Sequence, residues 1–545
     1  MALTEQASQA WLEELDQLLE AGQLGGRKLN EMERQRITNL RKMVELKINP
    51  YPAEAFEVSH LAKEVSENFS EEKAEDFKKV RLSGRLMSKR VMGKASFAEL
   101  QDSSGRIQFY VSRDEICPEE NKDLYNKVFK KLLDIGDYVG IEGYAFYTKT
   151  GTLSIHVEKF IFLGKAIRNL PIVKTDNEGN VHDAFTDAEQ RYRMRYVDLT
   201  VNPQYKEIFL TRSKVVREMR HFFDAQGWLE VETPILQAVH GGAAARPFET
   251  HHNTLDEDLY LRIANELYLK RLIVAGFDGV YEIGKMFRNE GMDRTHNPEF
   301  TSMEIYVAYK DYIWMMQMVE QLFEKICLAV HGSSSIKIRK QHGKEFTTHE
   351  VNFAGPFEKL SIYDAIEKHS GHNLRNMSEE EIFALCKELH IDVDASMGRA
   401  KLIDEVFGET TEPHLIQPTF ITDYPIEMTP LAKKHRSEEG LVERFELFVM
   451  GKEIANAYTE LNDPIDQRRR FEDQLRLAER GDEEAMAMDE DFLRALEYGM
   501  PPCSGLGIGI DRLVMLMTDQ TSIQEVLFFP QMRALKKKTE EQEEA

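Results

Sequence analysis

The segment Gly505-Leu506-Gly507-Ile508-Gly509-Ile510-Asp511-Arg512 decides which folds this chain can use to bind a nucleotide. Its glycines follow a GxGxG pattern, but Ile510 stands where the dinucleotide-binding fingerprint has its third glycine. Gly93-Lys94-Ala95 and Gly343-Lys344-Glu345 both lack the hydroxyl residue that follows the lysine of a phosphate-binding loop. Both common nucleotide-binding folds are therefore disfavoured. The segment instead predicts a glycine-rich strand, which a ligand can approach closely, leading into a helix that begins with Asp511.

A second patch, Phe287-Arg288-Asn289-Glu290 followed by His296-Asn297-Pro298-Glu299-Phe300, carries complementary chemistry. A guanidinium holds phosphate in a fixed two-pronged geometry. The patch adds a carboxylate and an aromatic ring, which can read and stack a nucleobase. The alternative interpretation is a surface salt bridge between Arg288 and Glu290, which are strand neighbours on one face. The presence of both patches in one chain favours a nucleotide site.

The composition is that of a soluble globular protein with two or more domains. The chain has 545 residues, of which 42% are hydrophobic and 30% charged. Its four cysteines form no CxxC pair, so we expect neither a zinc site nor a disulfide framework. This cysteine usage favours a reducing, cytoplasmic setting. The first residues lack the pattern of a signal or transit peptide, and no apolar run is long enough for a membrane span.

The net charge of −24 argues only against indiscriminate binding to nucleic acid, because a local basic face can still hold phosphate. Such a face is available between residues 27 and 47. Its basic residues are Arg27, Lys28, Arg34, Arg36, Arg41, Lys42 and Lys47. The alternative is a solvated helix face that binds no partner.

Periodicity divides the chain into a small strand-rich block and a larger mixed block. In the first, Ile107, Phe109 and Val111 alternate after a turn, and further short strands surround one helical segment. This pattern fits a five-stranded OB barrel, although another small barrel would also fit. In the second, helices and strands mix without regular alternation, which predicts an α+β domain on an antiparallel sheet. The predicted divisions are a helical extension at 1–65, the barrel at 66–165, a linker at 166–187, the α+β domain at 188–535 with a helical insertion at about 361–409, and a charged tail at 536–545.

Together the two patches resemble motifs 2 and 3 of the class II aminoacyl-tRNA synthetases. Over essentially Asn30 to Arg533, the chain closely resembles the lysyl-tRNA synthetase family of subclass IIb. The resemblance rests on the runs Arg191-Tyr192-Arg193-Met194-Arg195-Tyr196-Val197-Asp198-Leu199, Gly241-Gly242-Ala243-Ala244-Ala245-Arg246-Pro247-Phe248, Ala264-Asn265-Glu266-Leu267-Tyr268-Leu269-Lys270 and Glu460-Leu461-Asn462-Asp463. It implies an enzyme that forms lysyl-adenylate from L-lysine and ATP, then transfers the lysine to the terminal ribose of lysine tRNA. It also implies an N-terminal OB-fold barrel and a C-terminal class II catalytic domain.

Activation of this kind requires positioning and charge neutralisation rather than a general base, because the attacking carboxylate is already ionised at pH 7. We expect Arg288 to hold the α-phosphate and the substrate carboxylate. Phe300 would stack beneath the adenine, with Arg512 above it and near the γ-phosphate. Glu290 would accept from the adenine amino group, and His296 would lie by the far phosphates. The implied catalytic residues are Arg288 and Arg512, and the implied ATP-binding residues are Arg288, Glu290, His296, Asn297, Phe300, Glu446, Gly509 and Arg512.

Glu446 and Glu453 are candidate magnesium ligands. Glu446 lies in Phe445-Glu446-Leu447-Phe448 and Glu453 in Gly451-Lys452-Glu453-Ile454. An acidic residue beside apolar neighbours on a strand is costly to bury unless the carboxylate serves an ion or a partner. Magnesium prefers oxygen ligands. The pair therefore predicts Mg²⁺ bridging the phosphates of ATP, and the alternative is two strand glutamates that face solvent.

By resemblance, the lysine pocket consists of Gly242, Glu266, Glu304, Tyr306, Asn456, Tyr458 and Glu460. Carboxylates are also what a pocket for an ammonium group needs, because charge-assisted contacts are the strong ones. We assign Glu266 to the α-amino group of the substrate and Glu460 to its ε-ammonium. The family often has phenylalanine where Tyr458 stands, and the added hydroxyl must find a partner or water.

The barrel is expected to read unpaired anticodon bases by stacking and by contacts to base edges. The family positions for these contacts fall on Phe97 and Gln108. A family glutamate in the late strand aligns with Thr152, so its contact is lost or moves to Glu158 or another neighbour.

Motif 1 of the class maps onto a helix at Ser213–Gln226 and a strand ending at Pro234. The resemblance therefore implies a homodimer with Pro234 at its interface. Two other functions compete with lysine ligation: an aspartyl- or asparaginyl-tRNA synthetase, and a non-catalytic RNA-binding paralogue. An anionic substrate side chain would need arginine or lysine where this pocket has glutamates. A non-catalytic protein would be free to lose motif residues that this chain retains.

Overall fold

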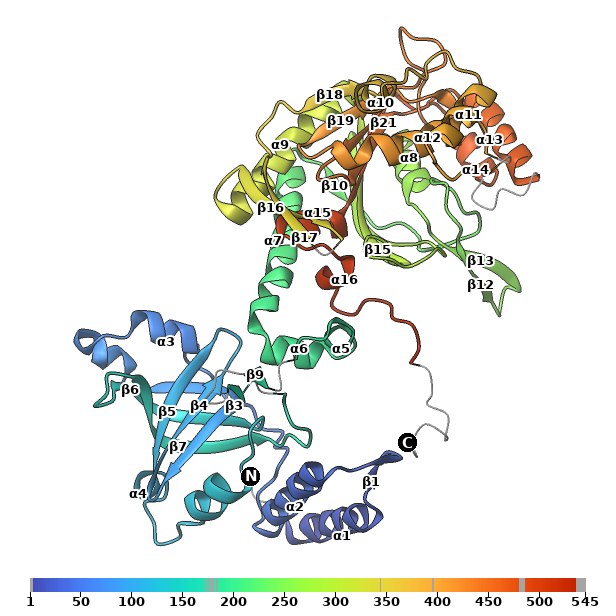
Figure 1. The fold of residues 1–545 in the computed structure, drawn as a ribbon. Helices are drawn as coiled ribbons and strands as arrows, with labels where there is room; N and C mark the ends of the chain where they lie inside the picture. The colour runs from blue at the N-terminus through green and yellow to red at the C-terminus, as the bar shows by residue number, and fades with distance from the viewer. Residues whose placement is uncertain are drawn as a thin grey trace. The chain divides into compact units, whose positions relative to one another are not determined.

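The computed structural model describes residues 3–171, 174–175, 181–182, 185–343, 345–394, 397–479 and 486–535. The chain forms two compact units, Met1–Phe185 and Thr186–Ala545. Each unit is built on its own β-structure (Figure 1). The predicted charged tail at 536–545 and part of the predicted linker at 166–187 lie outside the described residues.

The first unit contains a closed five-stranded barrel with the strand order β3-β4-β5-β7-β6. β5 and β7 run parallel, and the other neighbouring strands run antiparallel. Leu100, Phe109 and Val157 are fully buried inside it, because successive side chains of a strand point to opposite faces. The predicted five-stranded barrel is confirmed. Its strands are β3 (Val80–Met92), β4 (Ala95–Gln101), β5 (Arg106–Ser112), β6 (Tyr138–Tyr147) and β7 (Leu153–Gly164).

Short helices accompany the barrel, and local sequence sets their ends. The Asn30 side chain accepts from the Glu33 amide at 2.9 Å, and the Glu33 carboxylate accepts from the Asn30 amide at 3.1 Å, which caps α2 reciprocally. α1 ends at Gly22, whose φ of 64° suits glycine. The remaining elements of the unit are α1 (Glu5–Ala21), β1 (Gln23–Leu24), β2 (Arg27–Lys28), α2 (Glu31–Glu45), α3 (Ala62–Asn68), η1 (Glu71–Phe77), α4 (Arg113–Ile116), η2 (Leu124–Leu132), β8 (Lys174–Thr175) and β9 (Val181–His182).

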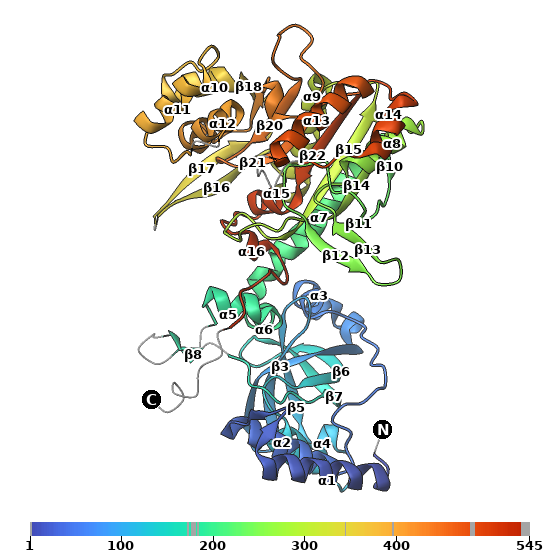
Figure 2. The same ribbon diagram turned by 90° about the vertical axis from the view of Figure 1, so that its right-hand side faces the viewer.

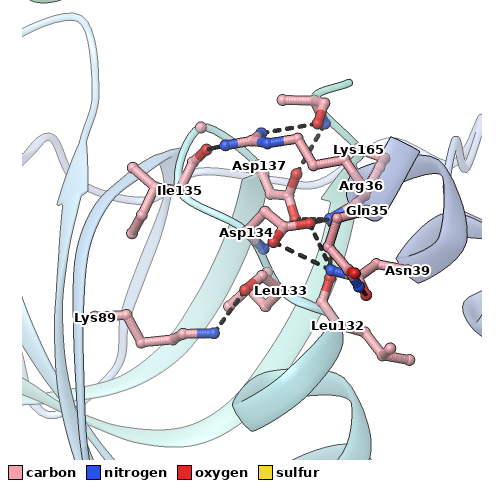
Figure 3. Close-up of polar contacts among 12 residues, drawn as sticks. Gln35, Arg36, Asn39, Lys89, Leu132, Leu133, Asp134, Ile135, Asp137 and Lys165 are labelled. Carbon is pink, nitrogen blue, oxygen red and sulfur yellow. Dashed lines mark hydrogen bonds and ion pairs between the residues drawn. The ribbon is translucent and has the colours of Figure 1, made fainter. Parts of the chain in front are cut away.

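Polar contacts fix α2 against the barrel (Figure 3). Arg36 donates to the carbonyl oxygens of Ala166 at 2.9 Å and Ile135 at 2.7 Å. Asn39 donates to Asp134 Oδ2 at 3.0 Å. Arg36 is buried by these contacts, so it does not belong to the phosphate-binding face that the sequence suggested.

Internal ion pairs occupy further cations of the same basic stretch. Arg41 pairs with Asp16 at 2.5 Å and also with Glu45. Arg27 pairs with Glu33 at 2.8 Å. Much of the positive charge is thus compensated within the first unit, which favours the alternative of a solvated helix face.

The second unit is organised by an eight-stranded sheet with the order β10-β14-β15-β22-β21-β20-β19-β18. Its central strands are antiparallel, as predicted, but the two outer pairs, β10–β14 and β18–β19, are parallel. The sheet is therefore mixed. The β18–β19 pair follows from its connection, because helices α10 to α12 lie between the two strands and return the chain to the same end of the sheet. The strands are β10 (Leu229–Glu230), β14 (Gly279–Phe287), β15 (Glu299–Ala308), β18 (Glu358–Ser361), β19 (Thr419–Thr422), β20 (Arg444–Phe448), β21 (Glu453–Thr459) and β22 (Cys503–Gly509).

Helices cover one face of this sheet with an apolar core. Phe223 of α7, Phe323 of α9 and Leu513 of α15 pack in one cluster with Ile305 and Ile508 of the central strands. Figure 2 shows β21, β22 and β15 side by side in this unit. Because strand side chains alternate, the residues next to Ile305 and Ile508 point to the opposite face, which leaves that face for the polar groups of a site.

The remaining elements of the second unit include the predicted insertion, whose helices α10, α11 and α12 form a separate apolar cluster with β19 and β20. The helices are α5 (Ala188–Arg193), α6 (Arg195–Val201), η3 (Pro203–Tyr205), α7 (Lys206–Asp224), α8 (Glu266–Val274), α9 (Tyr312–His331), α10 (Ile362–Ser370), α11 (Glu379–Glu388), α12 (Arg399–Thr410), η4 (Glu412–His414), η5 (Ile426–Met428), α13 (Pro464–Glu479), α14 (Glu490–Glu497), α15 (Ile510–Met517) and α16 (Ile523–Val526). The smaller strands are β11 (Leu236–Gln237), β12 (Phe248–His252), β13 (Glu257–Leu261), β16 (Ser335–His342) and β17 (Glu345–Asn352).

Two further observations concern the chain as a whole. Within the described ranges, no helix combines the length and the apolar character that a bilayer span requires. The four cysteines are buried free thiols: Cys117, Cys327, Cys386 and Cys503.

Candidate active site

A row of glycines, called the trough below, lies on the polar face of β22 and is flanked by larger residues of both neighbouring strands. Gly505 pairs with Tyr306 of β15 on one side and with Tyr458 of β21 on the other. Gly507 likewise lies between Glu304 and Asn456. Directly opposed residues share a face, so each glycine stands between two larger side chains. The GxGxG pattern predicted from sequence as a close-approach strand therefore has a defined structural role.

The neighbouring side chains leave room only for glycine at position 505. A Cβ atom there would overlap Glu460 Oε1 and the ring of Tyr306. At Gly507 the nearest atom to such a Cβ would be Glu304 Cγ at 3.8 Å, an ordinary contact. The Glu460 carboxylate therefore occupies the space that any side chain at position 505 would need.

The second arginine patch forms the turn between β14 and β15. Arg288 donates its backbone amide to the Pro298 carbonyl at 2.9 Å, which closes this turn. Its guanidinium lies over the Phe300 ring, 5.2 Å from the centroid. Within the described part of the chain, Arg288 Nε is buried without a hydrogen-bond partner. This nitrogen is thus a buried donor with no acceptor among the described residues.

The first turn of α15 brings the other arginine to the same place. Arg512 Nη2 lies 3.1 Å from His296 Nε2, and Arg512 Nη1 donates to the Glu453 carbonyl at 2.9 Å. His296 Nδ1 lies 2.8 Å from Asp293 Oδ2. Two segments more than 200 residues apart therefore meet, as their pairing in the sequence predicted. Glu290 is exposed and takes no part in these contacts.

Arg212 of α7 is a residue that sequence reasoning missed. Its Nη1 donates to Asp511 Oδ1 at 2.5 Å and its Nη2 donates to Thr301 Oγ1 at 3.0 Å. Asp511 Oδ2 in turn accepts from the Thr301 amide at 2.7 Å. Thr301 follows Phe300 and Asp511 precedes Arg512, so one side chain ties the two arginine patches together. Nothing in the spacing of Arg212 indicates this contact.

Asn297 and Gly509 lie at the edges of this arrangement. Asn297 donates to the Glu299 carbonyl at 2.6 Å and accepts from the Gln531 amide at 3.3 Å. Gly509 immediately precedes α15 and pairs with Ser302 of β15. Both residues shape the backbone on which the arginines stand.

Glu446 and Glu453 lie on neighbouring strands near Arg512. Glu446 accepts from Tyr424 at 2.8 Å and pairs with Arg444, while Glu453 Oε2 lies 3.3 Å from Arg512. Burial, opposed by Arg444 but reinforced by Glu453, raises the pKa of Glu446 to about 7. Among the described residues no three acidic, histidine or cysteine side chains gather as a metal site. A cation here would need most of its oxygen ligands from a bound nucleotide.

An acidic pocket lies further along the trough. Tyr458 donates to Glu266 Oε1 at 2.5 Å, and Tyr306 donates to Glu304 Oε2 at 3.2 Å. Glu266, Glu304 and Glu460 are all buried. Burial and the charge of Glu266 raise the pKa of Glu304 to about 8. The Tyr458 hydroxyl, which needed a partner, finds it in a pocket carboxylate.

Lys270 stands inside this acidic pocket. It lies one helical turn after Glu266 on α8, and its Nζ is 2.5 Å from Glu266 Oε1. Lys270 also forms an ion pair with Glu460. Although burial opposes its charged form, Glu266 and Glu460 raise the pKa of Lys270. The i, i+4 spacing of Glu266 and Lys270 was the sequence signal available for this contact.

Gly242 and Asn456 complete the predicted pocket residues. Gly242 has a φ of 90°, and a Cβ there would lie 3.0 Å from Ala264 Cβ and 3.2 Å from Glu266 Cβ. Asn456 accepts from Arg444 at 3.2 Å. Gly242 thus lets its loop lie against the start of α8, while Asn456 stands between the acidic pocket and the Glu446 side of the trough.

The barrel carries a ridge of aromatic rings next to its predicted anticodon residues. The rings of Phe97 and Tyr110 are 5.2 Å apart, and His156 lies 5.0 Å from Tyr110. Tyr144 stacks on His156 at 4.7 Å. Phe146 extends the ridge. Of the five rings only Phe97 was singled out from sequence, although Tyr144 and Phe146 have the spacing of one strand face.

The other predicted barrel positions differ in their surroundings. Gln108 Oε1 accepts from Ser154 at 2.6 Å, which orients its amide. Thr152 is exposed in the turn before β7, and its amide donates to Thr148 Oγ1 at 3.0 Å. Glu158 is exposed on β7 beyond the aromatic ridge. Pro234, in the second unit, is exposed between β10 and β11.

Comparison with known proteins covers both units. The family described as "tRNA synthetases class II (D, K and N)" matches residues 187–533, and "OB-fold nucleic acid binding domain" matches residues 80–163. A lysine–tRNA ligase of Christiangramia forsetii is 60% identical over 95% of this chain and 88% of its own length. A lysine–tRNA ligase of Porphyromonas gingivalis is 57% identical over 93% of this chain and 86% of its own length. A third, of Azobacteroides pseudotrichonymphae, is 56% identical over 92% of this chain and 99% of its own length.

Proposed function

The chain belongs to the family of class II tRNA synthetases for D, K and N (aspartate, lysine and asparagine), and we propose that it joins L-lysine to a lysine tRNA in an ATP-dependent reaction. The observation that carries this proposal is the buried acidic pocket of Glu266, Glu304 and Glu460. Three carboxylates suit a substrate with two ammonium groups. An aspartyl or asparaginyl enzyme would place an anionic or neutral side chain against them, at a large electrostatic cost.

Phe300 and Glu304 share one face of β15 and are four residues apart, which corresponds to about 13 Å along a strand. Adenine bound at the Phe300 end would place its α-phosphate near Arg288, whose guanidinium lies 5.2 Å from the centroid of the Phe300 ring. L-Lysine in the acidic pocket would extend its carboxylate towards the same phosphate.

The first step is an in-line displacement. A lysine carboxylate oxygen forms a bond to the α-phosphorus while the bond from that phosphorus to the bridging oxygen breaks, and pyrophosphate leaves. Arg288 neutralises charge on the phosphate and holds the attacking carboxylate, and Arg512 holds the far phosphates with His296. The buried, unpartnered Arg288 Nε supports this role. Glu290 accepts from the adenine amino group.

In the second step the terminal ribose hydroxyl oxygen of the tRNA forms a bond to the lysyl carbonyl carbon and releases its proton, while the bond from that carbon to the phosphate oxygen breaks and AMP leaves with this oxygen. Within the pocket Glu266 accepts from the α-amino group and Glu460 from the ε-ammonium. Tyr306, Asn456 and Tyr458 line the trough beside them, and the remaining pocket residues are Gly242 and Glu304. Charge-assisted hydrogen bonds of this kind are stronger than neutral ones.

Glu446 and Glu453 would hold Mg²⁺ together with the phosphates of ATP. Their proximity and the raised pKa of Glu446 fit a pair of carboxylates that gains from a nearby cation. When bound, the ion neutralises the phosphates and stabilises the departing pyrophosphate. The Glu446 contacts with Arg444 and Tyr424 keep its carboxylate oriented.

The barrel would bind the anticodon of the tRNA. The half-buried ring of Phe97 offers a surface for a base, and the Ser154 contact orients Gln108 for a base edge. The aromatic ridge beside Phe97 supports stacking by more than one base. His156, rather than Thr152, is the residue on the late strand that lies within this ridge.

We place the enzyme in the cytoplasm as a homodimer. Free buried thiols fit a reducing compartment. Large apolar side chains stand exposed around the motif 1 elements: Leu210 by 60%, Leu229 by 48% and Leu236 by 49%. Exposed apolar groups of this kind favour an interface with a second copy, and Pro234 lies among them.

Amino-acid-dependent exchange of pyrophosphate into ATP, screened across the twenty amino acids with magnesium, tests the assignment. We expect exchange with lysine alone. Exchange with aspartate or asparagine would reassign the substrate. No exchange from folded protein would indicate a non-catalytic RNA-binding protein.

A further inference from the structure

Lys270 is a cation enclosed within the site that is proposed to bind a cationic substrate. Its side chain is fully buried, with Nζ 2.5 Å from Glu266 Oε1 and in an ion pair with Glu460 Oε2. The ring of Tyr458 lies 5.5 Å from the ammonium and that of Phe492 lies 5.8 Å from it. The ammonium therefore holds two carboxylates that come from different parts of the fold, one from α8 and one from the end of β21.

Lys270 contacts Glu460 through one carboxylate oxygen, Oε2. Both carboxylate oxygens of Glu460 are buried, and neither accepts a hydrogen bond from another described residue. Oε1 lies against Gly505. A buried carboxylate without hydrogen-bond donors is costly unless a ligand supplies the missing donors. Lys270 thus holds the Glu460 carboxylate by Oε2, while Oε1 still lacks a donor.

The charge of Lys270 also changes the charge balance of the pocket. At pH 7 Glu304 is mostly protonated, because its pKa is raised to about 8, so the negative charge of the pocket comes from Glu266 and Glu460, and Lys270 offsets one negative charge. L-Lysine brings two ammonium groups, while its carboxylate is taken by Arg288. Without Lys270, two neighbouring buried carboxylates would lose their cation, and one of them would take up a proton.

We propose that Lys270 is a positioning residue for substrate selection: by pairing with both Glu266 and Glu460, it holds these two carboxylates in place to receive the ammonium groups of the amino acid. This inference rests on the proposed lysine ligation and deepens it. Lys270 does not touch the reacting atoms. It acts through the two carboxylates that do contact the amino acid.

Several titratable groups face the Lys270 ammonium and its carboxylates. They are Glu266 of α8, Glu304 and Tyr306 of β15, Tyr458 and Glu460 at the end of β21, Cys503 of β22, and Arg262 between β13 and α8. Glu304 titrates in both the wild type and any Lys270 variant. The effect of Lys270 is therefore measured as the ratio of the two proteins' KM values for lysine at each pH.

The Lys270→Met variant tests the proposal, because methionine has a similar volume and no charge. We expect the KM for lysine in pyrophosphate exchange to rise about tenfold at pH 7, since one pKa unit of protonation corresponds to a factor of ten. The ratio of variant to wild-type KM should fall as pH rises to 9, because the trapped proton is lost while the substrate ε-ammonium remains charged. The KM for ATP should not change. Lys127→Met, which removes an exposed i, i+4 ion pair with Asp123, is the matched control and should behave as wild type.

A double-mutant cycle with Glu460→Gln sharpens the test. In the Glu460→Gln variant, the Lys270 ammonium and the substrate ammonium lie near each other, and the pocket has one carboxylate fewer to offset their charges. Adding Lys270→Met to this background should therefore improve lysine binding several-fold, although the same substitution weakens it in the wild type. Calorimetry of lysine binding without ATP measures all four corners and does not depend on turnover. The double variant replaces both partners by neutral residues of similar size and leaves no unpaired charge between them. It can therefore be measured even if a single variant fails to fold.

The outcomes separate this proposal from the assigned reaction. If the wild-type protein exchanges pyrophosphate with another amino acid, or with none, the lysine assignment is wrong. The proposed match between the charges of the pocket and of lysine is then wrong as well. Wild-type protein that uses lysine, with a Lys270→Met variant of unchanged lysine KM at every pH, would overturn only the role of Lys270. A loss that is equal for ATP and lysine and independent of pH would show a purely structural residue and would also overturn it.

Discussion

Arg212 Nη1 donates to Asp511 Oδ1 across 2.5 Å, which joins the long helix α7 to the residue next to Arg512. The same guanidinium reaches Thr301, the residue next to Phe300. The two ends of the nucleotide site are therefore set by one side chain from a third element.

Arg212→Ala should raise the KM for ATP about tenfold or more, because hydrogen bonds to charged groups contribute about 1.5–3 kcal/mol. The KM for lysine should change much less, since the acidic pocket lies further along the trough. Steady-state pyrophosphate exchange measures both. Arg220→Ala on the same helix, which removes an exposed pair with Glu230, is the control. Equal effects of the two substitutions on ATP would contradict the account.

Gly505→Ala should weaken the use of lysine about a hundredfold in kcat/KM, because the new Cβ and the Glu460 carboxylate need the same space. Gly507→Ala on the same strand should have a smaller effect, since its Cβ would make only an ordinary 3.8 Å contact. Calorimetric titration with lysine ranks the two variants. The reverse order would mean that Glu460 is not held against β22.

The free protein should lose stability as pH rises through about 8. Burial and Glu266 raise the pKa of Glu304 to about 8, so the folded state binds a proton that the unfolded state releases near its ordinary pKa of 4.5. The stabilisation from this proton is fully present below that ordinary value and is lost as pH rises through the folded value. Glu304→Gln removes the titration. The Tm of the wild type should therefore fall relative to the variant between pH 6 and pH 9, and a constant difference would contradict the assignment.

Phe97→Ala should lower kcat/KM for tRNA by about tenfold to a hundredfold, because a base–aromatic stack contributes about 1–3 kcal/mol. Pyrophosphate exchange with lysine should be unaffected, since it requires no tRNA. Tyr147→Ala removes another exposed ring of β6 outside the aromatic ridge and serves as the control. Equal losses in charging and exchange would indicate a folding defect instead of a stacking role.

The sequence predicted the features that depend on local pattern. Alternating residues indicated the barrel, and the GxGxG segment indicated a strand that a ligand approaches. The structure confirms the barrel and the glycine-rich strand, and it adds that Gly505 and Gly507 pair with larger residues on both sides. The strands that pair with β22 lie far away in the sequence, so the β22 segment alone does not predict its pairing partners.

The sequence did not predict which partners the charged residues contact. Arg36 belongs to a basic stretch, but it faces backbone carbonyls of the barrel. Lys270 lies in a run typical of the family, yet its place between Glu266 and Glu460 depends on the meeting of α8 with the end of β21. The parallel outer strands of the sheet were missed for a related reason, since strand direction depends on the path of the connecting helices.

Aminoacylation of unfractionated tRNA tests most directly whether this chain attaches lysine to lysine tRNA. Each labelled amino acid is supplied in turn with ATP and magnesium, and the charged tRNA is then isolated and sequenced. We expect label from lysine only, ester-linked to tRNA of the lysine-accepting class. Charging with aspartate or asparagine, or lysine found on other tRNAs, would contradict it.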